Sequence, residues 1–174
     1  MNEGAVATPS QAAKVEWDEI KDGTPEKFET AIAGLFDLAQ ENVIMLTDFY
    51  APFYNRPKVK ESIENAANRV QTFRVVLDSH VDVPRLREDV AWLFENKKIE
   101  IEKSDAPVPH WMMMDHKHFR FEKPHPPNEP GKSNLIVRNA NLDQGLAPLV
   151  SGAINFIRET WEDSDPVESA ATKS

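Results

Sequence analysis

Residues 109–125 read PHWMMMDHKHFRFEKPH and contain four of the five histidines of the chain. Two strand-like runs, 110–115 and 118–123, flank His116 and Lys117, and this pattern predicts a β-hairpin with a two-residue turn. In that register one face would hold Met112, Met114, Phe119 and Phe121, and the other Trp111, Met113, Arg120 and Glu122. Histidine titrates near neutral pH and is the commonest metal ligand, so we expect any chemical site to lie here.

Outside this hairpin, helix-like and strand-like segments alternate along the chain. Apolar spacing predicts helices over about 24–39, 58–69, 82–98 and from near Pro148 to Glu162, and strands over 43–47, 73–77, 99–102 and 135–137. Thr24 and Pro25 should cap and open the first helix. The alternation predicts an α/β fold: a layered domain with a mixed, largely parallel sheet flanked by helices.

The composition bounds the class of protein. A chain of 174 residues with 40% apolar and 28% charged residues is typical of one soluble globular domain, which we expect over residues 23–162. Residues 1–22 are expected to form a flexible acidic tail and residues 163–174 a disordered acidic tail. No apolar run is long enough to predict a membrane span.

Charge and cysteine content narrow the partners and the compartment. The net charge is −9 and no basic stripe occurs, so we expect no nucleic-acid partner. The chain has no cysteine, which excludes disulfides and thiolate chemistry and suits a cytoplasmic protein.

A candidate ligand-binding crevice follows the first two predicted strands. Loops beyond the carboxyl ends of strands in open α/β sheets commonly form ligand sites, and polar or aromatic residues follow both strands. Together with two residues of the hairpin, the candidate ligand-binding set is Asp48, Tyr50, Tyr54, Arg56, Asp78, His80, His110 and Arg120.

The order of elements over residues 24–162 resembles one half of the phospholipase D-like superfamily. In that family a hairpin carries the catalytic motif His-x-Lys-x-x-x-x-Asp, and a strand and a long helix close the unit. Here His110 matches the family histidine, but Met112 replaces the lysine and Asp115 falls two residues early. Residues 122–125 stand where the family has Gly-Ser-x-Asn.

These departures imply a degenerate member of the family. Its histidine attacks phosphorus while its lysine stabilises the phosphoryl oxygens, and methionine can neither carry charge nor donate a hydrogen bond. The resemblance therefore implies a non-catalytic regulatory module that needs no cofactor, like family domains that bind sugars, other effectors or phosphoinositides. It would recognise a partner protein or a small ligand, and it would form a homodimer, because the two halves of this fold usually pack around the site.

Two alternatives stay open. In the first, the chain is a phosphodiesterase or nuclease that uses His110, with His116 or His118, in a site made by two chains. In the second, Asp115, His116 and His118 of the hairpin bind a metal ion, since imidazole nitrogen and carboxylate oxygen suit zinc. A polar turn explains the same residues, and we predict no metal.

Overall fold

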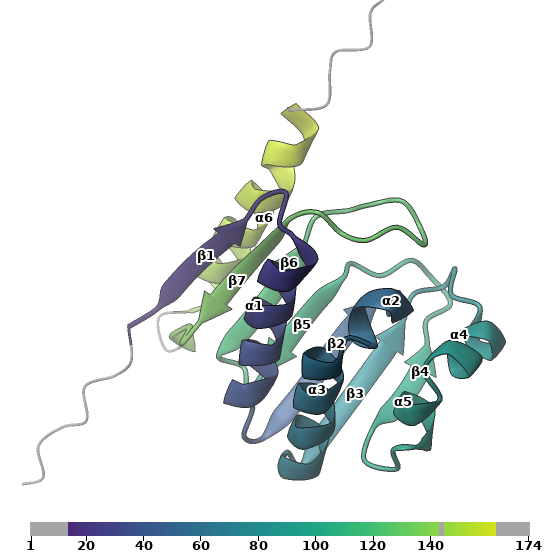
Figure 1. Cartoon of the computed structure of the whole chain (residues 1–174). Coiled ribbons are helices and arrows are strands. Elements are labelled where there is room, and N and C mark those ends of the chain that lie inside the picture. The colour runs from purple at the N-terminus through teal and green to yellow at the C-terminus, as the bar shows by residue number, and fades with distance from the viewer. Residues whose placement is uncertain (1–13, 143–144, 163–174) are drawn as a thin grey trace, which may run out of the picture.

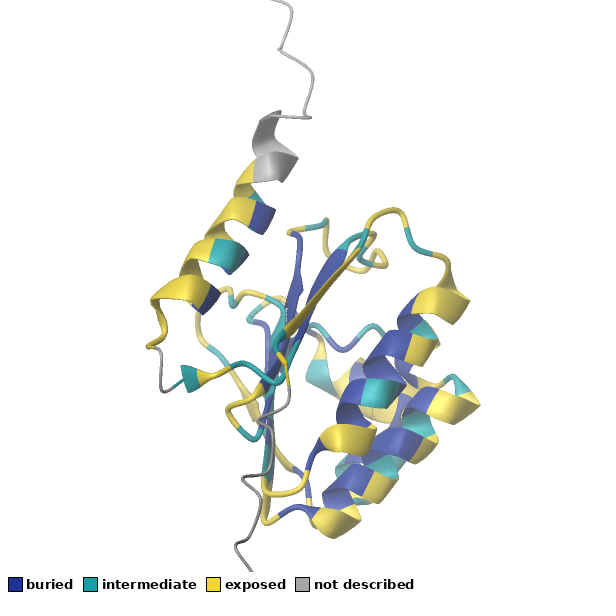
Figure 2. Ribbon diagram, turned by 90° about the vertical axis from the view of Figure 1, so that its left-hand side faces the viewer, coloured by how far each residue is buried: buried dark blue, intermediate teal, exposed yellow. Residues whose placement is uncertain are grey.

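The computed structural model describes residues 14–142 and 145–162, which form one seven-stranded sheet with helices on both faces (Figures 1 and 2). The strand order is β1-β7-β6-β5-β2-β3-β4. In chain order the elements are β1 (Glu16–Ile20), α1 (Pro25–Leu38), β2 (Asn42–Thr47), α2 (Ala51–Tyr54), α3 (Pro57–Arg69), β3 (Thr72–Leu77), α4 (Val83–Asp89), α5 (Ala91–Glu95), β4 (Glu100–Lys103), β5 (Trp111–Met114), β6 (His118–Glu122), β7 (Asn134–Arg138) and α6 (Ala147–Glu162).

The helices begin where the capping signals predict. The Thr24 hydroxyl accepts a hydrogen bond from the backbone N–H of Lys27 at the start of α1, where Pro25 takes the first helical position. Asp82 caps α4 in the same way, by accepting from the N–H of Arg85. The helix predicted from residue 82 divides at Val90 into α4 and α5.

The prediction of a largely parallel sheet is wrong. Only the β2–β3 and β3–β4 pairs are parallel, because helices cross over between these strands. The other four pairs are antiparallel. Two of these, β5–β6 and β6–β7, join strands that follow one another through loops without an intervening helix. The fold is a mixed sheet covered by helices, as Figure 1 shows.

The register of the β5–β6 hairpin also differs from the prediction. Its turn contains three residues, 115–117, and Met114 pairs with His118. A shift of one residue moves every side chain of a strand to the opposite face. Arg120 therefore pairs with Met112, and β6 presents His118, Arg120 and Glu122 on the face that carries the larger core.

The first strand lies where a tail was expected. Residues 16–20 form β1, which pairs antiparallel with β7 from Glu16 and Arg138 to Ile20 and Asn134. Four of its five residues are exposed, so its stability comes from main-chain pairing and the sequence carries no apolar alternation. The expected tail over 1–22 is corrected at these positions. Residues 1–13 and the tail predicted over 163–174 lie outside the described residues.

Two apolar cores lie on opposite faces of the sheet. The larger one packs α1 and α3 against the sheet and includes Phe36, Ile63 and Phe73. The smaller one lies beneath α6 and includes Phe121, Leu149, Phe156 and their neighbours. Figure 2 shows α6 alone on its side of the sheet. Among the helices of the described residues, none has both the length and the apolar character that crossing a bilayer requires.

Candidate functional site

The site lies at the edge of the sheet where β2 and β3 end. Asp48 follows β2 and Asp78 follows β3, so both carboxylates come to the same edge. Because β5 runs antiparallel to β2, with Trp111 opposite Leu46, its preceding residue His110 enters at this edge. The Nδ1 atom of His110 lies 4.0 Å from Asp48 Oδ1, and its Nε2 atom lies 3.8 Å from Asp78 Oδ2.

The next two strands add a buried ionic pair to this edge. β6 ends at Glu122, whose backbone N–H donates to the carbonyl of His110, and Asn134 opens β7 directly opposite Glu122. Arg120 Nη2 lies 2.7 Å from Glu122 Oε1, and Arg120 Nε donates to Asn134 Oδ1. All three side chains are buried. The hairpin register is what brings them to this face.

The loop that follows β6 folds back and adds a second histidine. His125 Nε2 lies 3.0 Å from His110 Nδ1 and 3.8 Å from Glu122 Oε2. Its Nδ1 atom lies 3.0 Å from the carbonyl oxygen of Pro126. A carbonyl can only accept, so Nδ1 of His125 carries a proton and donates it to this carbonyl.

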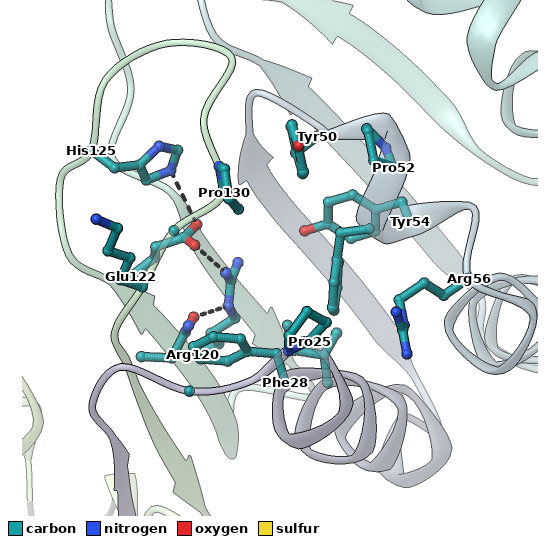
Figure 3. A pocket seen from close by; sticks show the side chains of 16 residues that line it. Pro25, Phe28, Tyr50, Pro52, Tyr54, Arg56, Arg120, Glu122, His125 and Pro130 are labelled. Atoms are coloured by element: carbon teal, nitrogen blue, oxygen red, sulfur yellow. Dashed lines mark hydrogen bonds and ion pairs between the residues drawn. The ribbon is translucent and has the colours of Figure 1, made fainter.

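A cavity of about 380 Å³ opens beside this cluster. Figure 3 shows Phe28 and Tyr54 on its walls, with Arg120 and Glu122 between them and His125. The complete lining is Gly23, Pro25, Phe28, Ile32, Tyr50, Pro52, Phe53, Tyr54, Arg56, Arg120, Glu122, His125, Pro130, Gly131, Lys132 and Asn134. Its walls are apolar and aromatic, and its polar floor consists of Arg120, Glu122 and Asn134.

Two hydrogen-bond donors on this floor have no acceptor. Arg120 Nη1 and Asn134 Nδ2 are buried, and neither has a hydrogen-bond partner within the described part of the chain. The two residues are only 4% and 1% exposed. Buried donors are almost always paired in folded proteins, so two orphaned donors on residues that line a cavity are unusual.

The surroundings keep the acidic groups of the site ionised. Burial alone would raise the pKa of Glu122, but Arg120 and hydrogen bonds from His110 and His125 hold that pKa far below its usual range. Burial also opposes ionisation of Asp78, but the N–H groups of Val108 and His80 outweigh it and lower its pKa.

The pKa values of His125 and Tyr54 are shifted as well. The hydrogen bond to Glu122 raises the pKa of His125, which favours its protonated form. Burial raises the pKa of Tyr54 to about 12, so this hydroxyl keeps its proton at physiological pH.

All eight residues of the predicted ligand-binding set lie at or next to this site. Asp48, Asp78 and His110 form part of the ionisable cluster, and the cavity is lined by Tyr50, Tyr54, Arg56 and Arg120. His80 lies at the rim, where its Nδ1 atom is 2.8 Å from Asp78 Oδ1.

Of the residues named in the two alternatives, His110 belongs to the cluster, whereas Asp115, His116 and His118 lie apart from it. The Asp115 carboxylate accepts the backbone N–H groups of residues 40, 41 and 42, while His116 is exposed on the turn. His118 Nδ1 accepts from the N–H of Asn139. Across the described ranges 14–142 and 145–162, the group of three or more potential metal ligands that comes together is instead Asp48, His110 and His125.

Sequence reasoning missed Glu122, His125, Asn134 and Phe28 as site residues. Glu122 and Asn134 depend on the hairpin register, which a two-residue turn sets wrongly. His125 stands among prolines, a composition that predicts an exposed loop, yet its side chain is only 8% exposed. The useful signal was the unusual charge pattern Arg120-x-Glu122 in a strand of otherwise apolar character.

Comparisons with known proteins give the fold. No family model and no curated protein matches the sequence. Among solved structures, the chain is similar to TrmBL2, an archaeal chromatin protein with a novel mode of DNA binding, at 15% identity and a TM-score of 0.55. That match covers 91% of this chain but 54% of TrmBL2, so the chain spans about half of that protein.

Two further solved structures are similar. NucT from Helicobacter pylori matches with 9% identity and a TM-score of 0.55 over 86% of this chain and 97% of NucT. Phosphatidylserine synthase from Haemophilus influenzae Rd KW20 matches with 11% identity and a TM-score of 0.47, over 83% of this chain and 38% of the synthase. With its mixed sheet, its central hairpin and the likeness to NucT over nearly the whole of both chains, the protein has a phospholipase D-like fold.

Proposed function

We propose that this domain is a non-enzymatic binding module that takes a small ligand into the cavity beside Arg120 and Asn134. The observation that carries the proposal is the pair of orphaned donors, Arg120 Nη1 and Asn134 Nδ2. Leaving a buried donor unpaired costs about 1–3 kcal/mol. A ligand oxygen that accepts from both atoms removes this cost and gains affinity.

The charges of the site select an uncharged ligand. Arg120 is already neutralised by Glu122 at 2.7 Å, so a ligand anion placed at Arg120 would also meet the negative charge of Glu122. A carbonyl or hydroxyl oxygen accepts the same hydrogen bonds without this repulsion. The ring walls of Phe28 and Tyr54 suit a flat apolar surface. Sugars, nucleosides and aromatic amides have this combination of groups.

The charges around His110 argue against phosphodiester chemistry. Carboxylate oxygens of Asp48, Asp78 and Glu122 all lie within 4.0 Å of its ring nitrogens. Two like charges 4 Å apart repel by about 4 kcal/mol at an effective dielectric constant of about 20. Without a bound cation, a phosphodiester anion would face this repulsion from several carboxylates. Arg120, which lies opposite Met112 in the hairpin, is engaged by Glu122.

The test compares binding to the protein and to one isosteric variant. A panel of sugars, nucleosides and aromatic amides is screened by the rise in unfolding temperature, and ligands that bind are measured by calorimetry. Asn134→Asp replaces the free Nδ2 donor with an acceptor while keeping an oxygen for Arg120, and it should weaken binding by about tenfold or more. Asn128→Asp makes the same change on an exposed loop and should leave affinity unchanged.

Three outcomes would contradict the proposal. One is a ligand that binds equally well to Asn134→Asp, and another is a panel in which only phosphate-bearing compounds bind. The third is hydrolysis of bis(p-nitrophenyl) phosphate that disappears in His110→Ala, because this would favour a phosphodiesterase.

We also propose that two copies of the domain associate through α6. Leu146, Val150 and Ile154 recur at four-residue spacing and are 47–58% exposed. Val150 and Ile154 also line an apolar groove of about 300 Å³ between α6 and the sheet, whose other side includes Leu46 and Met113. The apolar stripe of one copy matches the groove of a second copy in chemistry, which supports a homodimer.

Two further proposals concern nucleic-acid binding and the cellular compartment. The expectation that no nucleic acid binds rests on the net charge of −9, and the likeness in fold to a DNA-binding chromatin protein weakens it. A gel shift with duplex DNA at physiological salt tests this expectation. The cysteine-free composition supports the proposal of a cytoplasmic location.

A further inference from the structure

We infer that Asp48, His110, Glu122 and His125 form a binding site for one divalent transition-metal ion of the zinc class. Ligand atoms of Asp48, His110 and His125 all lie within 4.8 Å of one another. Glu122 lies close to both histidines. Its Oε2 atom is 3.6 Å from His110 Nδ1 and 3.8 Å from His125 Nε2.

The spacing of these atoms suits a tetrahedral ion. Zinc bonds to nitrogen and oxygen are about 2.0–2.2 Å long, which separates neighbouring ligand atoms in a tetrahedron by about 3.3–3.6 Å. His110 Nδ1 lies 3.0 Å from His125 Nε2, 3.6 Å from Glu122 Oε2 and 4.0 Å from Asp48 Oδ1. These three separations, all measured from His110 Nδ1, bracket the tetrahedral value.

The ring nitrogens that face away from the proposed ion lie near acceptors, one of them within hydrogen-bond distance. A histidine ligand usually donates its other ring N–H to a carbonyl or carboxylate, which fixes the coordinating nitrogen. His125 Nδ1 bonds the carbonyl of Pro126, and His110 Nε2 faces Asp78 Oδ2 at 3.8 Å. Glu122 gives its second oxygen to Arg120 and keeps Oε2 for the cluster.

The charge of the cluster also calls for a cation. The side chains of Asp48, His110, Glu122 and His125 are 8–11% exposed, so water screens them weakly. With both imidazoles neutral, as metal binding requires, Asp48, Glu122 and the adjoining Asp78 face one guanidinium, that of Arg120, which leaves two negative charges in excess. A divalent ion neutralises them. None of its four ligands is Arg120 or Asn134, so this inference goes beyond the proposed ligand-binding function and is independent of its two donors.

The first experiment measures zinc binding by the full chain, purified without a histidine tag and stripped with EDTA. Calorimetric titration with ZnCl₂ should give one ion per chain with a dissociation constant on the order of a micromolar or tighter. Asp48→Asn and His125→Gln should weaken binding by about tenfold or more. The matched changes Asp105→Asn and His116→Gln, at exposed positions, should leave it unchanged. Equal affinity in all four variants, or no saturable heat, overturns the inference.

The second experiment identifies the ligands in the unmodified protein, so it does not depend on whether a variant folds. Long-range ¹H–¹⁵N spectra of the imidazoles should show zinc at Nδ1 of His110 and Nε2 of His125. The ring signals of His80, His116 and His118 should stay where they are. Zinc-dependent shifts confined to these last three histidines would overturn the site, as would unshifted signals from His110 and His125.

Discussion

The two carboxylate oxygens of Glu122 have separate partners. Oε1 pairs with Arg120 at 2.7 Å, and Oε2 lies within 3.8 Å of both imidazoles of the cluster. One side chain thus links the floor of the cavity to the proposed metal site. Glu122 and Arg120 are both buried, and the negative charge of Glu122 offsets the cost of burying the Arg120 guanidinium.

Replacing this carboxylate by an amide should therefore destabilise the fold. Glu122→Gln keeps the shape but leaves the Arg120 charge buried and unpaired, and removing one partner of a buried ion pair costs about 3–5 kcal/mol. Urea denaturation at pH 7 measures the loss. Glu129→Gln, on an exposed loop, should change stability by less than about 0.5 kcal/mol. Similar unfolding free energies for the two variants would contradict the proposed role of the pair.

At this scale the sequence predicted the residues that follow strands and missed those that depend on register. Asp48, Asp78 and His110 stand at strand ends, which can be located from apolar runs alone. Glu122 faces the cavity because the turn before β6 has three residues, and Asn134 faces it because β7 pairs this residue with Glu122. Nothing in the composition of the hairpin distinguishes a two-residue from a three-residue turn.

Among the elements, the β5–β6 turn is tied to the α1–β2 connection by Asp115. Its carboxylate accepts the backbone N–H groups of Gln40, Glu41 and Asn42 at 2.7–2.9 Å. Asp115 and His116 adopt positive φ angles of 54° and 55°, which Asp and His tolerate better than most residues. Asp115 therefore has a structural role: it forms the turn and holds the α1–β2 connection against it.

Asp115→Asn should destabilise the protein by about 1–3 kcal/mol at pH 7, because an amide has one acceptor oxygen and no charge. Burial would raise the pKa of Asp115, but the three N–H groups outweigh it and lower the pKa. A lowered pKa adds stability above the unfolded pKa of about 3.9. This stability is lost as the pH falls through the folded pKa.

Thermal unfolding of both proteins between pH 7 and pH 3 checks this dependence. The difference in unfolding temperature between wild type and Asp115→Asn should be largest at pH 7 and should shrink below about pH 4. Asp105→Asn, at an exposed position, serves as the control. A gap that stays constant over the whole range would show that the charge of Asp115 is not the cause.

The loop between β6 and β7 is fitted to the buried pair through Gly131. A Cβ at this position would overlap the Glu122 carboxylate, so Gly131→Ala should cost about 1–3 kcal/mol by displacing either the loop or Glu122. The same change at Gly34 meets no atom within 4 Å in α1 and should stabilise by up to about 1 kcal/mol. Denaturant unfolding should therefore show a lower free energy of unfolding for Gly131→Ala and a higher one for Gly34→Ala. If both changes stabilised the protein, the proposed close contact between Gly131 and Glu122 would be wrong.

For the whole molecule, the exposed stripe on α6 predicts a dimer. Light scattering at micromolar concentration should give a mass of about 39 kDa, twice the 19.7 kDa of one chain. Ile154→Asp places a charge in the proposed interface and should give single chains. Leu38→Asp alters a residue of similar exposure on α1 and should leave the dimer intact. A mass near 20 kDa for the unmodified protein would rule out the association.

The sequence predicted the layers of the molecule better than the directions of its strands. Apolar periodicity located the helices and the central strands, since both faces of the sheet are buried there. Strand direction depends on whether a crossover helix joins two strands, and the segment after β4 reaches β5 without one. β1 escaped prediction because four of its five residues are exposed and its pairing is made by the main chain.

That same strand forms the outer boundary of the sheet. β1 covers the rim of β7, whose Leu135, Ile136 and Val137 are apolar and buried, and it turns Glu16, Asp18 and Glu19 to solvent. An uncovered rim of this kind recruits further chains by β-addition, whereas an acidic border strand repels them. Truncation before Gly23 should consequently convert a dispersed protein into one that self-associates into insoluble material, even though no residue of the cavity or of the histidine cluster has been removed.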